Sequence, residues 1–245
     1  MSAPDDSGRT VTRREAIAIL GAAGAAAALG GATSSIEAMI PGPGAPACVL
    51  TPALEEGPFF VDEKLKRSDL VAGSSNPLVL QGLPLTLALT VVKVAPGGCT
   101  PLAGAYVDVW QAHAGGKYSD EAREGTVGEK YLRGYQVTDA AGLVTFKSIY
   151  PGWYPGRTVH THVMIRLMSS GGRQAIKYET QLFYDPALTT QVLSRAPYNA
   201  RGAADTVNGT DHIYADSQGR TIVPLVPVKA GSGFTGAFTL GIQGG

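Results

Sequence analysis

Short segments in which apolar and polar residues alternate recur along the chain, and Gly or Pro interrupts them. In segment 76–94 the apolar residues Leu85, Leu87, Leu89 and Val91 are two positions apart. A period of two places alternate side chains on opposite faces of a strand. Similar segments occupy residues 105–110, 142–146, 163–167, 178–184, 222–228 and 234–242. This pattern predicts an all-β fold, an antiparallel β-sandwich, with long irregular loops such as segment 185–218.

The first 38 residues are typical of an export signal followed by a linker. Arg13 and Arg14 precede the weakly apolar segment 16–20 and an Ala- and Gly-rich run that ends near Ala32. Paired arginines favour the twin-arginine route, and the apolar part is shorter than the ~20 residues of a membrane span. A disordered Ala-rich tail is the alternative. We expect residues 39–245 to form one domain and the protein to be exported, periplasmic or extracellular.

The two cysteines, Cys48 and Cys99, lie in the expected domain. Export to an oxidising compartment favours a disulfide between them, and two free, buried thiols are the alternative. Closing a loop of about 50 residues would contribute about 4 kcal/mol in the chain-entropy description.

The charge of the chain is balanced. The 245 residues carry 20 basic and 20 acidic side chains, and the formal net charge is zero. This balance does not indicate nucleic acid or an acidic polymer as a partner.

Two of the four histidines of the chain, His160 and His162, lie two positions apart. The segment that follows, 163–167, is apolar and rich enough in β-branched residues to continue as a strand. On a strand the two imidazoles would point to the same side, which is half of a metal site. Tyr154 and Arg157 lie just before them, in a segment with two Pro-Gly pairs.

The other metal ligands are not those of the common zinc sites, since the chain has no Cys-x-x-Cys or His-Glu-x-x-His motif. The remaining candidates are Tyr154 and Tyr118. A phenol has a pKa near 10 and binds well as phenolate, which a hard trivalent cation such as Fe(III) favours. Two tyrosinates and one hydroxide balance the charge of Fe(III), and a neutral cluster is less costly to bury.

Several motifs resemble those of the intradiol ring-cleavage dioxygenases, the protocatechuate, catechol and hydroxyquinol dioxygenase group. They are Glu56-Gly-Pro-Phe-Phe60, Trp110-Gln-Ala-His-Ala-Gly-Gly-Lys-Tyr118, Tyr131-Leu-Arg-Gly134, Ile149-Tyr-Pro-Gly-Trp-Tyr154, Arg157-Thr-Val-His160-Thr-His162 and Thr180-Gln181-Leu-Phe183. The resemblance extends from about residue 48 to residue 242. It implies a β-sandwich, in agreement with the strand pattern.

The resemblance also implies the roles of individual residues. One non-haem Fe(III) per subunit would be held by Tyr118, Tyr154, His160 and His162. Tyr154 and His162 would be the axial ligands. Arg157 would lie beside the substrate ring and Gln181 near it, so that Tyr154, Arg157 and Gln181 are the expected catalytic residues.

The reaction that the resemblance implies is cleavage of a catechol-type aromatic diol between its two hydroxyl-bearing carbons. Both atoms of O2 enter the product, a cis,cis-muconate-type dicarboxylate. The expected partners are therefore a small aromatic diol and O2, and not nucleic acid. We expect no stable membrane span. An oligomer is possible, and the sequence does not define its size. The alternatives are a secreted β-sandwich binding module without catalysis and a zinc hydrolase that uses His160 and His162.

Overall fold

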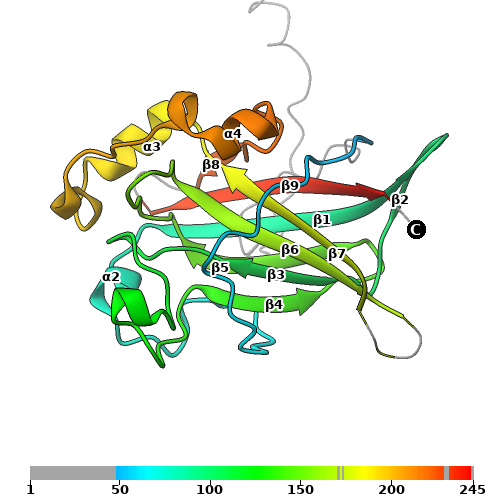
Figure 1. Cartoon of the computed structure of the whole chain (residues 1–245), viewed down its shortest axis with the longest axis horizontal. Helices are drawn as coiled ribbons and strands as arrows, with labels where there is room; N and C mark the ends of the chain where they lie inside the picture. Colours follow the sequence, from blue (N-terminus) through cyan, green and yellow to red (C-terminus); the bar gives the residue numbers. More distant parts are fainter. Residues whose placement is uncertain (1–47, 170–171, 173, 229–231, 244–245) are drawn as a thin grey trace, which may run out of the picture. The chain divides into compact units, whose positions relative to one another are not determined.

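The computed structural model describes residues 48–169, 172, 174–228 and 232–243. Two β-sheets form the framework of this part of the chain (Figure 1). The predicted export signal, residues 1–38, and its boundary with the domain lie outside the described residues.

The first sheet is built around β1 (Pro84–Ala95). Its other strands are β2 (Gly98–Pro101), β5 (Leu143–Ile149), β8 (Leu225–Pro227) and β9 (Phe234–Gln243). The order is β2-β1-β9-β8, and β5 also pairs with β1. Since β1 and β9 run parallel while the other pairs are antiparallel, this sheet differs in one pair from the purely antiparallel arrangement expected.

The second sheet is antiparallel throughout, in the order β4-β3-β6-β7. Its strands are β3 (Tyr106–Trp110), β4 (Arg133–Val137), β6 (His160–Met168) and β7 (Gln174–Phe183). Leu87 and Leu89 of β1 join Val107 of β3 and Val163 of β6 in one buried apolar cluster between the sheets. The predicted β-sandwich is therefore confirmed, and the alternating pattern of β1 has the burial that its period of two predicts.

The helices of the described residues are short. They are α2 (Pro77–Leu80), α3 (Pro186–Leu193) and α4 (His212–Ser217), with 3-10 turns η1 (Ala122–Glu124), η2 (Tyr198–Arg201) and η3 (Asn208–Thr210). In Figure 1 α2 lies apart from α3 and α4. None of the helices in the described ranges is long and apolar enough to cross a membrane.

The prediction of strand structure throughout segment 76–94 is wrong at its start, where α2 precedes the strand. The side chain of Asn76 accepts a hydrogen bond from the backbone N–H of Leu78, and Pro77 occupies the first turn. These are helix-start signals, and they outweigh the apolar residues that follow. The strand itself begins at Pro84. The strands β2 and β4 were not predicted, because both are short and mostly polar.

Cys48 and Cys99 form a disulfide, which confirms the favoured alternative. The bond joins residues 48–60, which we call the entering segment, to β2, across a sequence separation of 51 residues. Beyond it, the backbone N–H of Thr51 donates to the carbonyl of Gly241 in β9 at 2.8 Å. The entering segment is thus attached to the first sheet before it reaches the site.

Candidate metal centre and active site

His160 and His162 lie at the start of β6 and point the same way, as the strand period predicts. Their Nε2 atoms are 3.0 Å apart. Both side chains are buried, with exposed fractions of 2% and 1%. A rigid central strand thus holds two imidazole nitrogens side by side.

Tyr118 and Tyr154 reach the same point from two loops. Tyr118 follows β3, and its Oη lies 3.3 Å from Nε2 of His160 and 3.0 Å from Nε2 of His162. Tyr154 lies in the turn before β6, where it pairs with Arg157, and its Oη lies 3.1 Å from Nε2 of His160. The structure therefore brings together the four side chains that the sequence singled out.

The spacing of these four atoms fits one shared metal ion. Donors about 2.0–2.2 Å from an ion are about 3 Å from one another when neighbouring bonds are roughly perpendicular. The observed separations are 3.0 to 3.3 Å. No group of three His, Cys, Asp or Glu side chains able to hold a metal occurs in the part of the chain that the structure describes. A metal site here therefore depends on the phenols.

A hydrogen bond from Nδ1 leaves Nε2 of His160 available as a ligand atom, whereas Nδ1 of His162 is buried without a hydrogen-bond partner. Nδ1 of His160 donates to the carbonyl of Thr158 at 2.6 Å, so Nε2 is the unprotonated nitrogen of the neutral ring. The ring of His162 stacks on Trp110 at 4.8 Å between centroids. Burial lowers the pKa of His160 to about 3 and also lowers the pKa of His162. Both imidazoles are therefore neutral at pH 7, as a metal requires.

The phenols need a nearby cation to ionise. Burial, and then the neighbouring Tyr154, raises the pKa of Tyr118 well above its usual value. Burial also raises the pKa of Tyr154, while the Arg157 guanidinium acts in the opposite direction. A hard trivalent cation offsets such a shift because it stabilises the phenolate directly. The donor set thus fits a cation of this kind.

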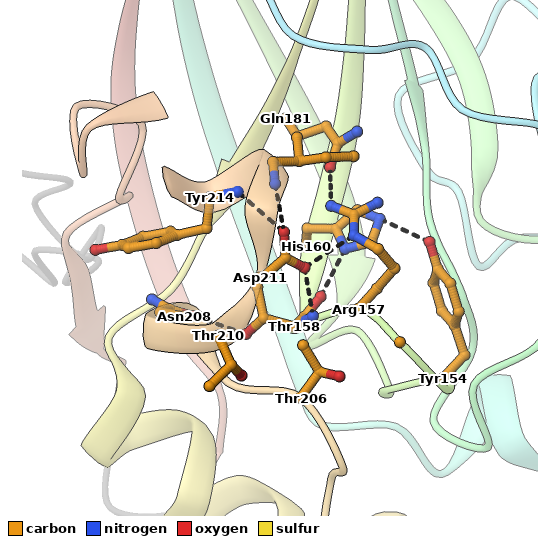
Figure 2. Close-up of polar contacts among 12 residues, drawn as sticks. Tyr154, Arg157, Thr158, His160, Gln181, Thr206, Asn208, Thr210, Asp211 and Tyr214 are labelled. Atoms are coloured by element: carbon orange, nitrogen blue, oxygen red, sulfur yellow. Dashed lines mark hydrogen bonds and ion pairs between the residues drawn. The ribbon is translucent and has the colours of Figure 1, made fainter. Parts of the chain in front are cut away.

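Arg157 and Gln181, the expected catalytic residues beside the ligands, are hydrogen-bonded to each other. Nη2 of Arg157 donates to Oε1 of Gln181 at 2.6 Å. Gln181 lies on β7 directly opposite His162, and its Nε2 donates to the carbonyl of Glu55 at 2.8 Å. Figure 2 shows the Arg157 guanidinium between Gln181 and Asp211. A cationic group is therefore held next to the four donors.

Residues 55–60 of the entering segment pass over this group of side chains. The ring of Phe59 stacks on Tyr118 at 4.3 Å and meets Tyr154 edge-on. Gly57 has a φ of +74°, and a Cβ placed on it would lie 3.3 Å from Cε1 of His162. The buried side chain of Arg133 donates from Nη1 to the carbonyl of Phe59 at 3.2 Å. The site is therefore covered by backbone that approaches the ligands closely.

Sequence reasoning did not identify Asp211 or the carbonyl of Thr158 as parts of the site. Asp211 lies in segment 185–218, whose irregular pattern predicts only loops, and an Asp before a short helix is common as a cap. The other two histidines are not at the centre. Nδ1 of His113 accepts from the N–H of Gly115 at 2.9 Å, and His212 is exposed on α4.

Comparison with known proteins gives the family. A family model described as Dioxygenase matches residues 55–186. An intradiol ring-cleavage dioxygenase from Tetranychus urticae is similar at 30% identity with a TM-score of 0.68, covering 80% of this chain and 95% of that one. The dioxygenase domain of a dioxygenase and carbohydrate-binding fusion from Streptomyces sp. SirexAA-E shares 31% identity with a TM-score of 0.55, covering 80% and 99%.

More distant structures share the fold. Catechol 1,2-dioxygenase from Acinetobacter sp. ADP1 is 23% identical with a TM-score of 0.55, covering 79% of this chain and 62% of that one. No curated protein matches the chain significantly. The matched residues include the loops of Tyr118 and Tyr154 and the strand of His160 and His162. The chain belongs to the dioxygenase family and is an intradiol ring-cleaving dioxygenase.

Proposed function

We propose that this enzyme holds one non-haem Fe(III) through Tyr118, Tyr154, His160 and His162. It would cleave a catechol-type aromatic diol between its hydroxyl-bearing carbons and form a cis,cis-muconate-type dicarboxylate. The observation that carries the proposal is the convergence of two phenol oxygens and two imidazole nitrogens within 3.0 to 3.3 Å of their neighbours. Phenolates select a hard, highly charged cation over zinc.

The four proposed ligands differ in how deeply they are buried. Tyr118, His160 and His162 are buried, whereas Tyr154 is half-buried and lies on a turn. Tyr154 is therefore the ligand best placed to be displaced by a substrate oxygen, and its phenolate can accept the proton that the diol releases. When bound, Fe(III) would chelate the diol and draw electron density from its ring, which prepares the ring carbon for O2.

Arg157 would stabilise negative charge that develops on the substrate. Its guanidinium is cationic and lies beside the phenol of Tyr154, where it opposes the increase in the Tyr154 pKa that burial causes. Such a preorganised cation stabilises an anionic transition state more in a buried site than in water. Gln181 holds one edge of the guanidinium, and its own amide is anchored on the carbonyl of Glu55.

The test is reconstitution with Fe(III) followed by spectroscopy and oxygen uptake. A tyrosinate-to-iron charge-transfer band in the visible range, weakened and shifted in Tyr118→Phe, would support the ligand set. Oxygen consumption with catechol, protocatechuate, hydroxyquinol and substituted catechols then defines the substrate. Zinc-loaded protein is the control. A colourless protein that contains stoichiometric iron contradicts the ligand assignment, and hydrolytic activity of the zinc form alone would favour the hydrolase alternative.

We also propose that the protein is exported through the twin-arginine route. The paired Arg13 and Arg14 support this route, and the disulfide of Cys48 and Cys99 supports export in general, because such bonds persist in oxidising compartments. Replacing both arginines with Lys should leave the protein in the cytoplasm, as cell fractionation would show. Unchanged export of that variant contradicts the proposed route.

A further inference from the structure

Asp211 is a buried carboxylate that accepts four hydrogen bonds. Its exposed fraction is 2%. Oδ2 accepts from Nε of Arg157 and from the backbone N–H of Thr158, both at 2.8 Å. Oδ1 accepts from the backbone N–H groups of Ile213 at 2.9 Å and Tyr214 at 3.0 Å (Figure 2). The two oxygens therefore face different partners, the active-site arginine on one side and the start of α4 on the other.

The bond to Asp211 fixes the orientation of the Arg157 guanidinium. A planar guanidinium held by one hydrogen bond can still rotate, whereas a second hydrogen bond from another of its nitrogens restrains that rotation. Nε is bound by Asp211 and Nη2 by Gln181, at 2.8 and 2.6 Å. The side chains of the ion pair are 12% and 0% exposed, so solvent screens the pair little.

The same carboxylate is connected to a proposed metal ligand through the backbone. Asp211 binds the N–H of Thr158, and the carbonyl of Thr158 accepts from Nδ1 of His160. The hydroxyl of Thr158 also donates to Oδ1 of Asn208 at 2.7 Å. A segment about 50 residues further along the chain thus holds the residues between Arg157 and His160 in place.

We infer that Asp211 is a positioning residue for the ring-cleavage reaction, which acts by holding Arg157 against the substrate site. The inference rests on the proposed function. Asp211 lies outside the residues 55–186 that match the family model, so its part in the site comes from the tertiary contacts. Helix capping alone would not explain the contacts of Asp211, since only Oδ1 faces α4 while Oδ2 faces Arg157.

The first experiment needs neither iron nor turnover. In the full-length metal-free protein, the Nε–H of Arg157 should give a slowly exchanging signal in 15N-edited NMR, identified by its absence in Arg157→Gln. Asp211→Asn should abolish its protection, because an amide cannot serve all four donors with acceptor oxygens. Asp185→Asn is the matched control, since Asp185 caps α3 through Leu188 as Asp211 caps α4. Absence of the protected signal in the wild type overturns the inference, even if Asp211→Asn fails to fold.

The second experiment is a double-mutant cycle on the iron-loaded enzyme. Asp211→Asn should reduce kcat/KM for the best catechol by about 10- to 100-fold, the usual effect of losing a supporting group, with the visible band retained. In an Arg157→Gln background the same change should reduce kcat/KM less than about 2-fold, because the two residues act as one unit. Asp185→Asn should leave kcat/KM unchanged.

Two outcomes separate this inference from the proposed function. If the wild type consumes no oxygen with any catechol, the proposed function fails while the NMR signal still reports on the pair. The other outcome is that the wild type turns over but Asp211→Asn reduces kcat/KM equally with and without Arg157. In that case Asp211 supports the folded structure in general and does not position Arg157, and the inference is wrong.

Discussion

Nδ1 of His160 donates a hydrogen bond to the carbonyl of Thr158, two residues earlier, at 2.6 Å. This bond decides which nitrogen of His160 faces the centre of the site. It leaves the lone pair of Nε2 directed toward Tyr154, Tyr118 and His162. The backbone carbonyl of Thr158 thus fixes the tautomer in which Nε2 of His160 can bind a metal, and this contact does not depend on the side chain at position 158.

His160→Ala should abolish stable iron binding. The change removes a donor and the hydrogen bond to Thr158, so the affinity should fall by more than the roughly 100-fold that loss of a supporting group costs. Metal analysis after dialysis against a weak chelator measures it. His212→Ala, at an exposed position on α4, is the control and should keep its iron. Equal iron in both variants contradicts the assignment of His160.

Tyr154→Phe should slow turnover while iron stays bound. The remaining three ligands are buried and unchanged, but the group that accepts the diol proton is gone. Loss of a general base typically reduces kcat by about 100-fold or more. Steady-state oxygen uptake, iron content and the position of the visible band check this. Tyr214→Phe on α4 is the control, and wild-type turnover by Tyr154→Phe would exclude the proposed role.

Gly57→Ala should perturb the metal centre, whereas Gly73→Ala should not. Both glycines have a positive φ, +74° and +78°, so Ala costs each about 1 kcal/mol of backbone strain. A Cβ at Gly57 lies 3.3 Å from His162, while Gly73 has no atom within 4 Å of such a Cβ. Thermal unfolding should show a similar loss in both. A change of the visible band confined to Gly57→Ala is expected, and identical spectra contradict the close approach.

His113 should make stability fall as the pH drops below about 6.5. Burial lowers its pKa from 6.5 to about 4 in the folded state. The unfolded chain therefore binds this proton more tightly, and the stabilisation present above pH 6.5 is lost toward pH 4. The full difference corresponds to about 3 kcal/mol. Urea unfolding at pH 7.5 and pH 4.5 measures it.

The variant His113→Asn isolates this contribution from the carboxylates. Asn can accept the hydrogen bond of Gly115 without titrating. The loss of stability between the two pH values should be smaller in His113→Asn than in the wild type and unchanged in His212→Asn. A pH dependence identical in all three proteins rules out His113 as its source.

Local sequence determined most of the strands and half of the proposed metal centre. The alternation of Leu85, Leu87 and Leu89 predicts a half-buried strand because side-chain period is a property of the backbone itself. The same period places His160 and His162 on one face without any reference to the rest of the fold. The family motifs extended the prediction to Tyr118, Tyr154, Arg157 and Gln181.

Only the tertiary structure decided which distant groups complete the site. Asp211 meets Arg157 across 54 positions of the chain, and β9 lies parallel to β1 across a far longer separation. Neither contact can be recognised from a periodic pattern. One carboxylate in an irregular segment resembles any helix cap, and the alternation of a strand does not specify whether its neighbour runs parallel or antiparallel. Such pairings depend on how the chain closes in space, because hydrogen bonds between remote segments are selected by the packing of the whole core.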